Sequence, residues 1–270
     1  MADRELEGKI AFVTGSGRGL GNVMARRLAE KGAHVAVHDL TWESPARFGE
    51  NPDLGAVVKQ IESMGVRSVG VSGNIGDRDA VAKMKSEIEA KLGPVELLVN
   101  CAGGDIGASG NKPEPNNMLG IPYEDIVTLV NNNLIGTMLV TMAFVPDMVK
   151  RHKGAVVNIG STAAHAGFSH GGMYATLKAG VVAYTRCVAA EVRTEGVRIN
   201  AVSPGPSKTA RFQATRVVDP QKMDSSGYTF DRYVEPGEIA DAVAFLLGPH
   251  ATMVHGQCLV VDGGLTLTPS

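Results

Sequence analysis

The chain reads Ala11-Phe12-Val13-Thr14-Gly15-Ser16-Gly17-Arg18-Gly19-Leu20-Gly21 close to its N-terminus. An apolar run breaks into glycines and a helical pattern follows, which predicts a strand, a tight turn and a helix. Glycines in such a turn let a pyrophosphate approach the backbone N–H groups at the positive end of the helix. The spacing differs from the common G-x-G-x-x-G fingerprint. We expect a dinucleotide site formed by Gly15, Arg18, Gly19, Leu20 and Gly21; the alternative is a glycine-rich connection without a ligand.

Short β-branched runs alternate with helical patterns from start to finish. The expected strands are Ile10–Val13, His34–His38, Ser68–Val71, Val95–Val99, Ala155–Ile159, Arg198–Val202 and Cys258–Val261. The expected helices are Leu20–Lys31, Leu54–Met64, Ala80–Leu92, Tyr123–Val149 (broken near Gly136), Met173–Thr194 and Pro236–Leu247. This order predicts an α/β fold of Rossmann type, a doubly wound parallel sheet of about seven strands with helices on both faces. The 270 residues contain no repeat or linker, so we expect one domain over residues 1–270.

An aspartate marks the end of the second expected strand. Asp39 follows His34-Val35-Ala36-Val37-His38 and lies twenty residues after Gly19. A carboxylate at this place accepts hydrogen bonds from the ribose hydroxyls of NAD and repels the 2′-phosphate of NADP. Leu40 offers no positive charge, whereas Arg18 could pair with such a phosphate. The sequence therefore favours NAD, with NADP as the alternative.

A phenol and an ammonium lie four residues apart in Tyr174-Ala175-Thr176-Leu177-Lys178. Residues at this spacing are neighbours on one helix face, so the charge of Lys178 favours the phenolate form of Tyr174. Ser161 lies thirteen residues upstream, where it ends an apolar run as a strand-end hydroxyl that could hold a substrate oxygen. Taken alone, the Tyr-x-x-x-Lys pattern also occurs as an ordinary surface pair.

Composition narrows the class of protein. A net charge of −2 gives no reason to expect nucleic acid as a partner, and no stretch approaches the roughly 18 apolar residues that span a bilayer. The charged residues 1–7 do not resemble a secretory signal. Cys101, Cys187 and Cys258 are odd in number and far apart, which indicates reduced thiols and no metal site. We expect a cytoplasmic protein with a small-molecule substrate, no nucleic acid and no membrane.

With both ends in view, the chain resembles the short-chain dehydrogenase/reductase family, in its shorter single-domain branch. The resemblance covers nearly the whole chain. It rests on motifs in family order: Thr14-Gly15-x-x-x-Gly19-x-Gly21, Asn100-Cys101-Ala102-Gly103, Asn133-Leu134-Ile135-Gly136, Ser161, Tyr174, Lys178, Pro204-Gly205 and Val261-Asp262-Gly263-Gly264.

The resemblance implies roles for these residues. Tyr174 would remove the proton of a secondary alcohol as hydride passes to the nicotinamide, and Ser161 would bond the same oxygen. Lys178 would stabilise the phenolate and also hold the nicotinamide ribose, while Asn133 would hold a proton-relay water. Further cofactor contacts would come from Asn74, Ile75, Asn100, Ala102, Gly103, Tyr174, Lys178, Pro204, Gly205 and Thr209. Two departures from the pattern are Asn74, where an aspartate is usual, and Cys101, which replaces an asparagine.

Two segments are longer than in the family pattern, and a third resembles a lid. Thr41–Asp53 contains Trp42, and Gly104–Leu119 is a polar loop after the fourth strand, at the sheet edge where ligands bind. The segment at about 206–233 is expected to form a substrate lid with an excess of cations. Arg211 is the candidate for binding a substrate anion; solvated surface charges are the alternative. His165 and His170 could line the pocket or lie on the surface.

The leading hypothesis is an NAD-dependent oxidoreductase that interconverts a polar secondary alcohol (a polyol, sugar or hydroxy acid) and its ketone. One alternative is an NADPH-dependent ketoreductase that acts on a 3-oxoacyl-type substrate. An alternative of another class is a non-catalytic nucleotide-binding sensor on the same fold. The resemblance also implies a homo-oligomer, a dimer or tetramer, that packs the helices around residues 136–150 and 173–194 across the interface.

Overall fold

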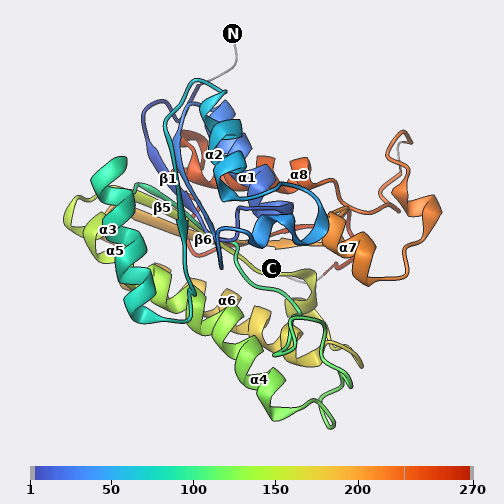
Figure 1. Ribbon diagram of the computed structural model, residues 1–270. Coiled ribbons are helices and arrows are strands. Elements are labelled where there is room, and N and C mark those ends of the chain that lie inside the picture. Colours follow the sequence, from blue (N-terminus) through green and yellow to red (C-terminus); the bar gives the residue numbers. More distant parts are fainter. Residues whose placement is uncertain (1–3, 228, 268–270) are drawn as a thin grey trace.

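The computed structural model describes residues 4–227 and 229–267, and a single parallel sheet runs through their centre (Figure 1). Its strand order is β3-β2-β1-β4-β5-β6-β7. The strands are β1 (Ile10–Val13), β2 (His34–Asp39), β3 (Ser68–Ser72), β4 (Leu97–Asn100), β5 (Gly154–Ile159), β6 (Val197–Pro204) and β7 (Cys258–Val261). This sheet confirms the predicted Rossmann-type fold, and β1 and β7 have the predicted bounds.

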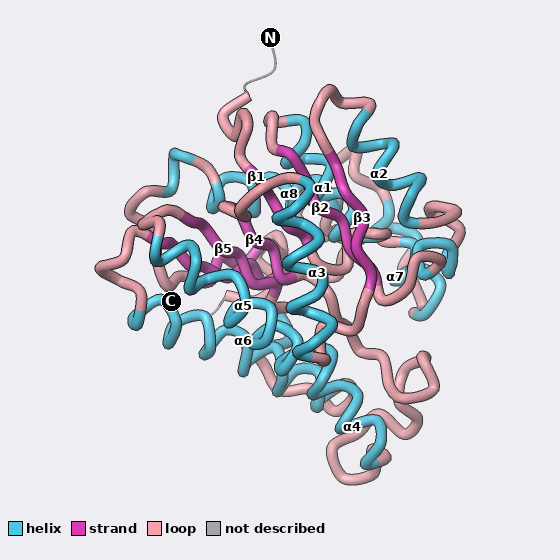
Figure 2. The backbone as a smooth tube through the Cα atoms, turned by 60° about the vertical axis from the view of Figure 1, so that its left-hand side comes forward, coloured by secondary structure: helices cyan, strands magenta, loops and turns pink. Residues whose placement is uncertain are grey.

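Helices cover both faces of the sheet, as Figure 2 shows. They are α1 (Gly19–Glu30), α2 (Leu54–Glu62), α3 (Arg78–Lys91), α4 (Tyr123–Val130), α5 (Gly136–Lys150), α6 (Gly172–Glu191), α7 (Ala210–Thr215) and α8 (Pro236–Leu247). Helices α1, α2 and α8 share one buried cluster with Val13 of β1. Helices α3 and α5, with the end of α6, share the other cluster with Phe12. Alternate residues of β1 thus face opposite cores, and full burial of each such apolar side chain stabilises the fold by about 1.5–3 kcal/mol.

The longest helical stretch contains a π turn. Between α4 and α5, residues Asn131–Ile135 (η2) form π-helix, just before the predicted break near Gly136. By length and composition alone the Tyr123–Lys150 helix could cross a membrane, with 28 residues and a mean hydropathy of 1.4. Helices that pack on the core of a sheet protein meet the same criterion. Only 33% of its most apolar window is buried, so much of its apolar surface faces outward.

The strand order changes direction between β1 and β4. From β1 the chain proceeds to β2 and β3 on one side, and β4 starts the other half of the sheet. In parallel sheets a ligand binds at such a switch point, in the crevice beyond the carboxyl ends of the strands. The glycine-rich turn, the loop after β4 and the serine after β5 all lie at that edge. The fold therefore gathers the predicted site residues from distant parts of the sequence.

Candidate active site

Helix α6 presents Tyr174 and Lys178 on one face, as their spacing predicts. The Lys178 ammonium lies 5.7 Å from the centre of the Tyr174 ring. Its side chain is buried, and Nζ donates a hydrogen bond to the carbonyl of Ile159 at 2.8 Å. A buried ammonium needs such a partner. The last residue of β5 therefore fixes where the Lys178 charge lies, and one main-chain bond uses only one of its three donors.

Ser161 lies two residues after the end of β5 and caps the short 3-10 turn η3 (Thr162–His165). Its Oγ accepts a hydrogen bond from the backbone N–H of Ala163 at 3.1 Å. This bond uses a lone pair and leaves the hydroxyl proton available for an oxygen of a substrate. Since η3 packs against α6, the strand end brings Ser161 to the helix that carries Tyr174.

Asn133 lies in the π turn η2 and is fully buried. Its Oδ1 accepts a hydrogen bond from the N–H of Gly104 at 2.8 Å. Its Nδ2 donates to the carbonyls of Gly104 and Leu129, each at 3.0 Å. The side chain therefore ties the helix to the loop after β4, and both of its donors are in use. The predicted relay water, which this side chain has no donor left to bind, stays a prediction.

The glycine-rich turn contacts the loop after β4 closely. Gly15 has a φ of 65°, and a Cβ on it would lie 2.8 Å from Cα of Ala102. The Thr14 hydroxyl accepts hydrogen bonds from the N–H groups of Cys101 and Ala102 at 3.0 and 3.1 Å. A larger residue at position 15 would push apart the two loops that border the crevice, which explains the glycine.

His38 of β2 bonds the glycine-rich turn and so stabilises it, a role that the sequence does not reveal. Its Nδ1 accepts a hydrogen bond from the N–H of Gly15 at 3.0 Å, and its Nε2 lies 2.9 Å from the carbonyl of Gly73. The two contacts fit a neutral ring with the proton on Nε2. Burial lowers the pKa of His38, which favours that neutral form. No local pattern distinguishes this histidine from an ordinary strand residue.

Asp39, the last residue of β2, lies next to the glycine-rich turn and to Arg18 within it. Asp39 is 8% exposed, and one of its oxygens accepts a hydrogen bond from the N–H of Leu40 at 2.8 Å. Burial lowers the pKa of Arg18, although the charge of Asp39 opposes this effect. Within residues 4–227 and 229–267, the buried Nη1 of Arg18 has no hydrogen-bond partner. A carboxylate for ribose hydroxyls and an unsatisfied donor for a ligand oxygen both fit a bound dinucleotide.

The other predicted cofactor residues differ in what their side chains do. The Nδ2 of Asn100 turns inward and donates to Asn158 Oδ1 at 2.8 Å and Thr141 Oγ1 at 3.0 Å, so this side chain belongs to a buried network. Asn74 closes its own turn by accepting from the N–H of Gly76 at 2.8 Å. Burial raises the pKa of the Cys101 thiol to about 11, which fits an unreactive spacer.

Three further members of the predicted cofactor set lie in the loops that follow β3 and β6. Ile75 packs on Gly136 at the start of α5. Gly205 donates its N–H to the carbonyl of Val261 at 2.9 Å. Thr209 caps α7, and its methyl group lies 4.0 Å from where a side chain on Gly19 would begin. The start of the predicted lid is therefore next to the glycine-rich turn.

Of the three substrate candidates, only Arg211 reaches the loop that follows β4. Its Nη1 donates to the carbonyl of Gly103 at 3.3 Å, and its guanidinium covers Gly104. His165 instead turns toward β6, where its Nε2 lies 3.0 Å from Ser203 Oγ. His170 is exposed in the turn before α6. The structure therefore places His165 against the carboxyl end of β6 and Arg211 against the loop after β4.

Most cations of the predicted lid are already paired. Lys208 Nζ contacts Glu235 Oε1 at 2.6 Å, and Arg232 forms two hydrogen bonds with Glu238. Arg211 and Arg216 have no carboxylate partner in the described part of the chain. Lys112 lies in the loop after β4, and its burial lowers its pKa. The charges of Arg216 and Arg211 lower this pKa further, while the charge of Asp105 raises it. The mouth of the crevice therefore carries more positive than negative charge.

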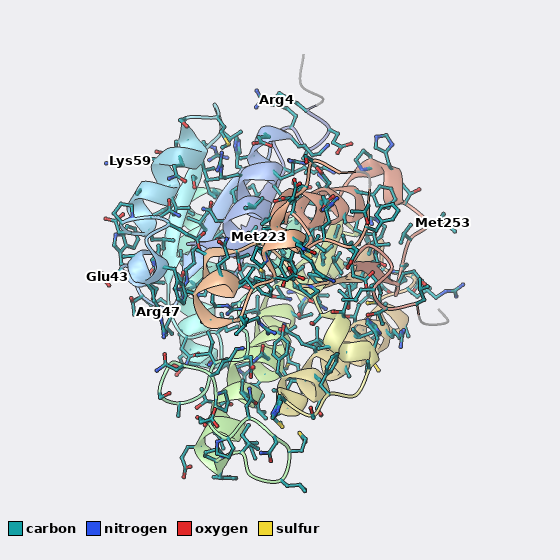
Figure 3. All side chains as sticks on the ribbon, turned by 90° about the vertical axis from the view of Figure 1, so that its right-hand side faces the viewer. Arg4, Glu43, Arg47, Lys59, Met223 and Met253 are labelled. Carbon is teal, nitrogen blue, oxygen red and sulfur yellow. The ribbon has the colours of Figure 1, made fainter. Side chains whose placement is uncertain are left out.

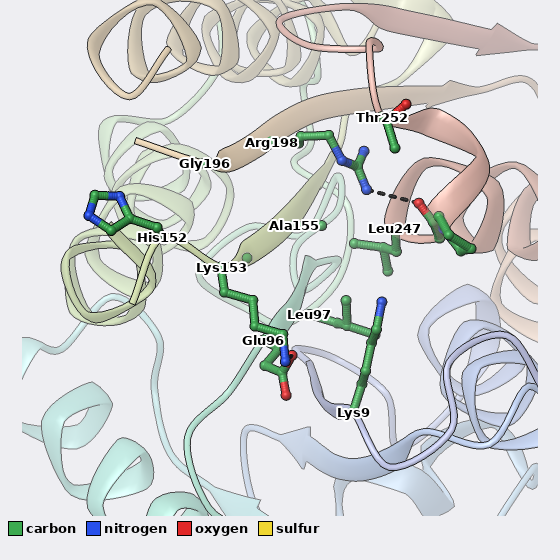
Figure 4. A pocket seen from close by; sticks show the side chains of 13 residues that line it. Lys9, Glu96, Leu97, His152, Lys153, Ala155, Gly196, Arg198, Leu247 and Thr252 are labelled. Atoms are coloured by element: carbon green, nitrogen blue, oxygen red, sulfur yellow. Dashed lines mark hydrogen bonds and ion pairs between the residues drawn. The ribbon is translucent and has the colours of Figure 1, made fainter. Parts of the chain in front are cut away.

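A cavity lies at the amino edge of the sheet, opposite the candidate site. It has a volume of about 210 Å³ and is bordered by the amino ends of β4, β5 and β6 (Figure 4). Arg198 points along it toward the end of α8, where it donates to the carbonyl of Gly248 at 3.1 Å. Ligands of parallel sheets bind at the other edge, so this cavity plays no part in the candidate site.

Comparison with known proteins agrees with this site. A family profile described as enoyl-(acyl carrier protein) reductase matches residues 15–266. A 2,3-dihydro-2,3-dihydroxybenzoate dehydrogenase of Bacillus subtilis is 30% identical over 99% of both chains. A 3-oxoacyl-[acyl-carrier-protein] reductase of Vibrio cholerae is 32% identical over 96% of this chain and 98% of its own.

Solved structures give the same result. A 7α-hydroxysteroid dehydrogenase complexed with NADH and 7-oxoglycochenodeoxycholic acid superposes with a TM-score of 0.83. It is 29% identical, and the match covers 97% of this chain and 96% of that one. These relatives are dehydrogenases and reductases that act on CH–OH groups. The chain is therefore an oxidoreductase that belongs to the short-chain dehydrogenase/reductase family.

Proposed function

We propose that the protein is an NAD-dependent dehydrogenase of a polar secondary alcohol: a polyol, sugar or hydroxy acid. The observation that carries the choice of NAD is the buried Asp39 carboxylate beside the glycine-rich turn. Gly17 faces Asp39 so closely that no side chain fits between them. A carboxylate there accepts from ribose hydroxyls, and its charge repels a 2′-phosphate.

The chain's own groups then perform the proton chemistry. A bound nicotinamide dinucleotide supplies the hydride acceptor for oxidation of the alcohol. Tyr174 takes the hydroxyl proton of the substrate as a phenolate, whose negative charge the Lys178 ammonium beside the ring stabilises before the transfer. Ser161 donates a hydrogen bond to the same substrate oxygen. The two free donors of Lys178 can hold ribose hydroxyls, because its third donor bonds the carbonyl of Ile159.

The charge at the mouth supports a substrate that carries an anionic group, such as a hydroxy acid. Arg211 lies at the carboxyl end of β4, and Lys112 and Arg216 lie within range of its charge. In Arg211→Ala, we expect KM for hydroxy acids to rise about 10- to 100-fold, since a charge-assisted bond contributes about 1.5–3 kcal/mol. KM for neutral polyols should stay the same. Arg193→Ala, an exposed arginine after α6, is the control; equal effects of the two variants would refute the role of Arg211.

A rival function has one specific observation in its favour. Arg18 has an unsatisfied buried donor near Asp39, and a 2′-phosphate would satisfy it. An NADPH-dependent ketoreductase, with a 3-oxoacyl-type substrate, is therefore the second candidate. A sensor without catalysis fits less well, because the chain has Ser161, Tyr174 and Lys178, and the Lys178 ammonium lies beside the Tyr174 ring.

One comparison separates these candidates. A panel of polyols, sugars and hydroxy acids is tested with NAD and with NADP, and nicotinamide absorbance is followed. We expect turnover with NAD to exceed turnover with NADP, and Asp39→Ser to shift the ratio toward NADP. A strong NADP preference in the unaltered protein would refute the proposal that Asp39 selects NAD by repelling a 2′-phosphate.

We also propose a cytoplasmic homo-oligomer, a dimer or tetramer, formed through α4, α5 and α6. Tyr123 and Val127 of α4 and Met142 of α5 are 72%, 40% and 62% exposed, an apolar strip that a second copy would cover. Light scattering should show that Met142→Glu lowers the mass of the assembly. An unchanged mass would place the interface elsewhere.

A further inference from the structure

The segment Thr41–Asp53, between β2 and α2, lies over the glycine-rich turn; we name it the strap. It contains a short 3-10 turn, η1 (Ser44–Phe48). The strap is attached at both ends: the carbonyl of Trp42 accepts from the N–H of Leu54 at 2.9 Å, and Asp53 caps α2. Figure 3 labels Glu43 and Arg47 on the strap, on the side of the molecule that also carries Met223 of the lid.

Residues 47–50 form the tip of the strap, and the tip places a carboxylate where an anion would bind. Glu50 Oε2 accepts a hydrogen bond from the N–H of Gly19 at 2.8 Å. Gly19 is the first residue of α1, so this N–H has no partner inside the helix. A carboxylate at a helix N-terminus makes the same kind of contact as a phosphate oxygen. Glu50 therefore stands where the pyrophosphate of a dinucleotide would bond.

Arg47 links the same tip to the polar loop after β4. Its guanidinium donates to the carbonyl of Gly110, and its Nη2 lies 3.4 Å from Asn111 Oδ1. Helix α7 of the lid also contacts η1. The tip therefore touches both the cofactor turn and the segments that border the substrate side.

A second contact of the strap avoids the anion position. Asn51 Nδ2 donates to the carbonyl of Gly17 at 2.9 Å, and Gln60 holds Asn51 Oδ1 at 2.8 Å. Asn51 is buried, whereas Arg47 and Glu50 are exposed. A ligand phosphate can compete with Glu50 without displacing Asn51. The strap can therefore lose the contact between Glu50 and Gly19 while Asn51 stays bonded to Gly17.

We propose that the strap is a gate opened by the cofactor. The pyrophosphate of a dinucleotide displaces Glu50 from Gly19, and the charge repulsion between the two anions moves the tip outward. Arg47 then leaves Gly110, which frees the polar loop to admit the substrate. This inference rests on the dinucleotide site of the proposed function.

Binding calorimetry of Glu50→Gln tests the first step. The variant removes the competing charge, so NADH and ADP-ribose should bind about 3- to 10-fold more tightly than to the unaltered protein. Adenosine has no phosphate, and its affinity should not change. Glu43→Gln, an exposed carboxylate of the strap without a contact to the turn, is the control and should leave all three affinities unchanged. Equal affinities of Glu50→Gln and the unaltered protein for ADP-ribose would overturn the proposal.

Hydrogen exchange followed by mass spectrometry tests the release of the tip. On binding of ADP-ribose, amides of Gly19 and Leu20 should exchange more slowly while those of residues 43–50 exchange faster. Slower exchange in both places would describe a clamp that closes on the ligand, and would overturn the gate. If neither NADH nor ADP-ribose binds to any of the proteins, the dinucleotide site itself fails and the gate fails with it. Tight binding with unaltered strap exchange refutes the gate alone.

Discussion

The catalytic groups and the rim of the crevice are held in different ways. Lys178 and Ser161 are fixed by main-chain groups of β5 and η3, inside regular elements. The strap and the lid are held by side chains that reach across loops, as Glu50, Arg47 and Lys208 do. Bonds between regular elements break only when those elements unfold, whereas a loop side chain is free to exchange its partner for water or a ligand.

The region held by main-chain bonds contains the groups that transfer the proton, and the region held by loop side chains controls how ligands enter. The groups that move a proton must keep their geometry through every cycle, since small displacements are costly in rate. The groups that admit ligands must exchange partners, and the bonds at the rim are of that kind. Changes in the first region should therefore alter turnover or stability strongly, and changes in the second should mainly alter affinity.

The largest effect on turnover is expected among the catalytic groups that regular elements hold. Tyr174→Phe removes only the hydroxyl, so the fold and dinucleotide binding should persist. The loss of the acid/base group should reduce kcat by about 10²- to 10⁴-fold. Steady-state rates with calorimetry of NADH binding measure both quantities. Tyr123→Phe, an exposed tyrosine of α4, is the matched control; a comparable loss there, or a fully active Tyr174→Phe, would contradict the assigned role.

Two buried asparagines, one in each region, allow their contributions to the free energy of unfolding to be compared. Asn133→Ala leaves the N–H and C=O of Gly104 and the carbonyl of Leu129 without their partner, and should lower the free energy of unfolding by about 2–4 kcal/mol. Asn51→Ala at the rim removes the bond to Gly17 and the bond from the exposed Gln60, which water can replace, and should cost about 1–2 kcal/mol. Denaturant titration of both variants decides this, and a larger cost for Asn51→Ala would reverse the comparison.

His38 ties the glycine-rich turn to the loop after β3, and it makes the stability of the fold depend on pH. Because burial lowers its pKa in the folded protein, the unfolded chain binds more protons below about pH 6.5. Stability is therefore complete above that pH and falls as the pH drops toward the lower folded pKa. His38→Asn keeps an acceptor for Gly15 but loses the contact with Gly73, which should cost about 1–2 kcal/mol at pH 8. This difference should shrink between pH 6.5 and 5; a constant difference would exclude His38 as the titrating group.

The smallest effect is expected away from both regions, where Asp147 of α5 pairs with Lys150 and with Lys85 of α3. Hydrogen bonds from Lys150 and Lys85 lower the pKa of Asp147 to about 2. A depressed carboxyl pKa stabilises the fold above the unfolded value of about 3.9, and this contribution is lost as the pH falls through 2. Asp147→Asn should cost at most about 1 kcal/mol at pH 7 and nothing below pH 2. Thermal melts across this range would contradict the assignment if the difference grew in acid.

Local patterns predicted the sheet and the catalytic groups because both depend on short spacings. A separation of four residues places Tyr174 and Lys178 on one face, and a glycine-rich turn after β1 needs no distant partner. Strand β1, strand β7 and helix α8 have the bounds that their patterns predict.

Other features depend on pairs that are far apart in the sequence. His38 bonds Gly15 and Gly73, and Glu50 bonds Gly19, with no local pattern that marks either residue. Helix α7 has six residues and no buried member, so periodicity could not reveal it. The inward direction of the Asn100 side chain depends on Asn158 and Thr141, which lie on other elements. Such contacts require the fold before they can be predicted.

The π turn at Asn131–Ile135 sets how α4 is oriented relative to α5. A π turn contains one residue more than an α turn, and each residue of a helix turns it by about 100°. The π turn therefore takes up one extra residue while α4 and α5 keep nearly the rotational relation of a regular helix. If the same residues formed α-helix throughout, Tyr123 and Val127 would be turned by about 100° relative to Met142, and the apolar strip proposed as the interface would be divided.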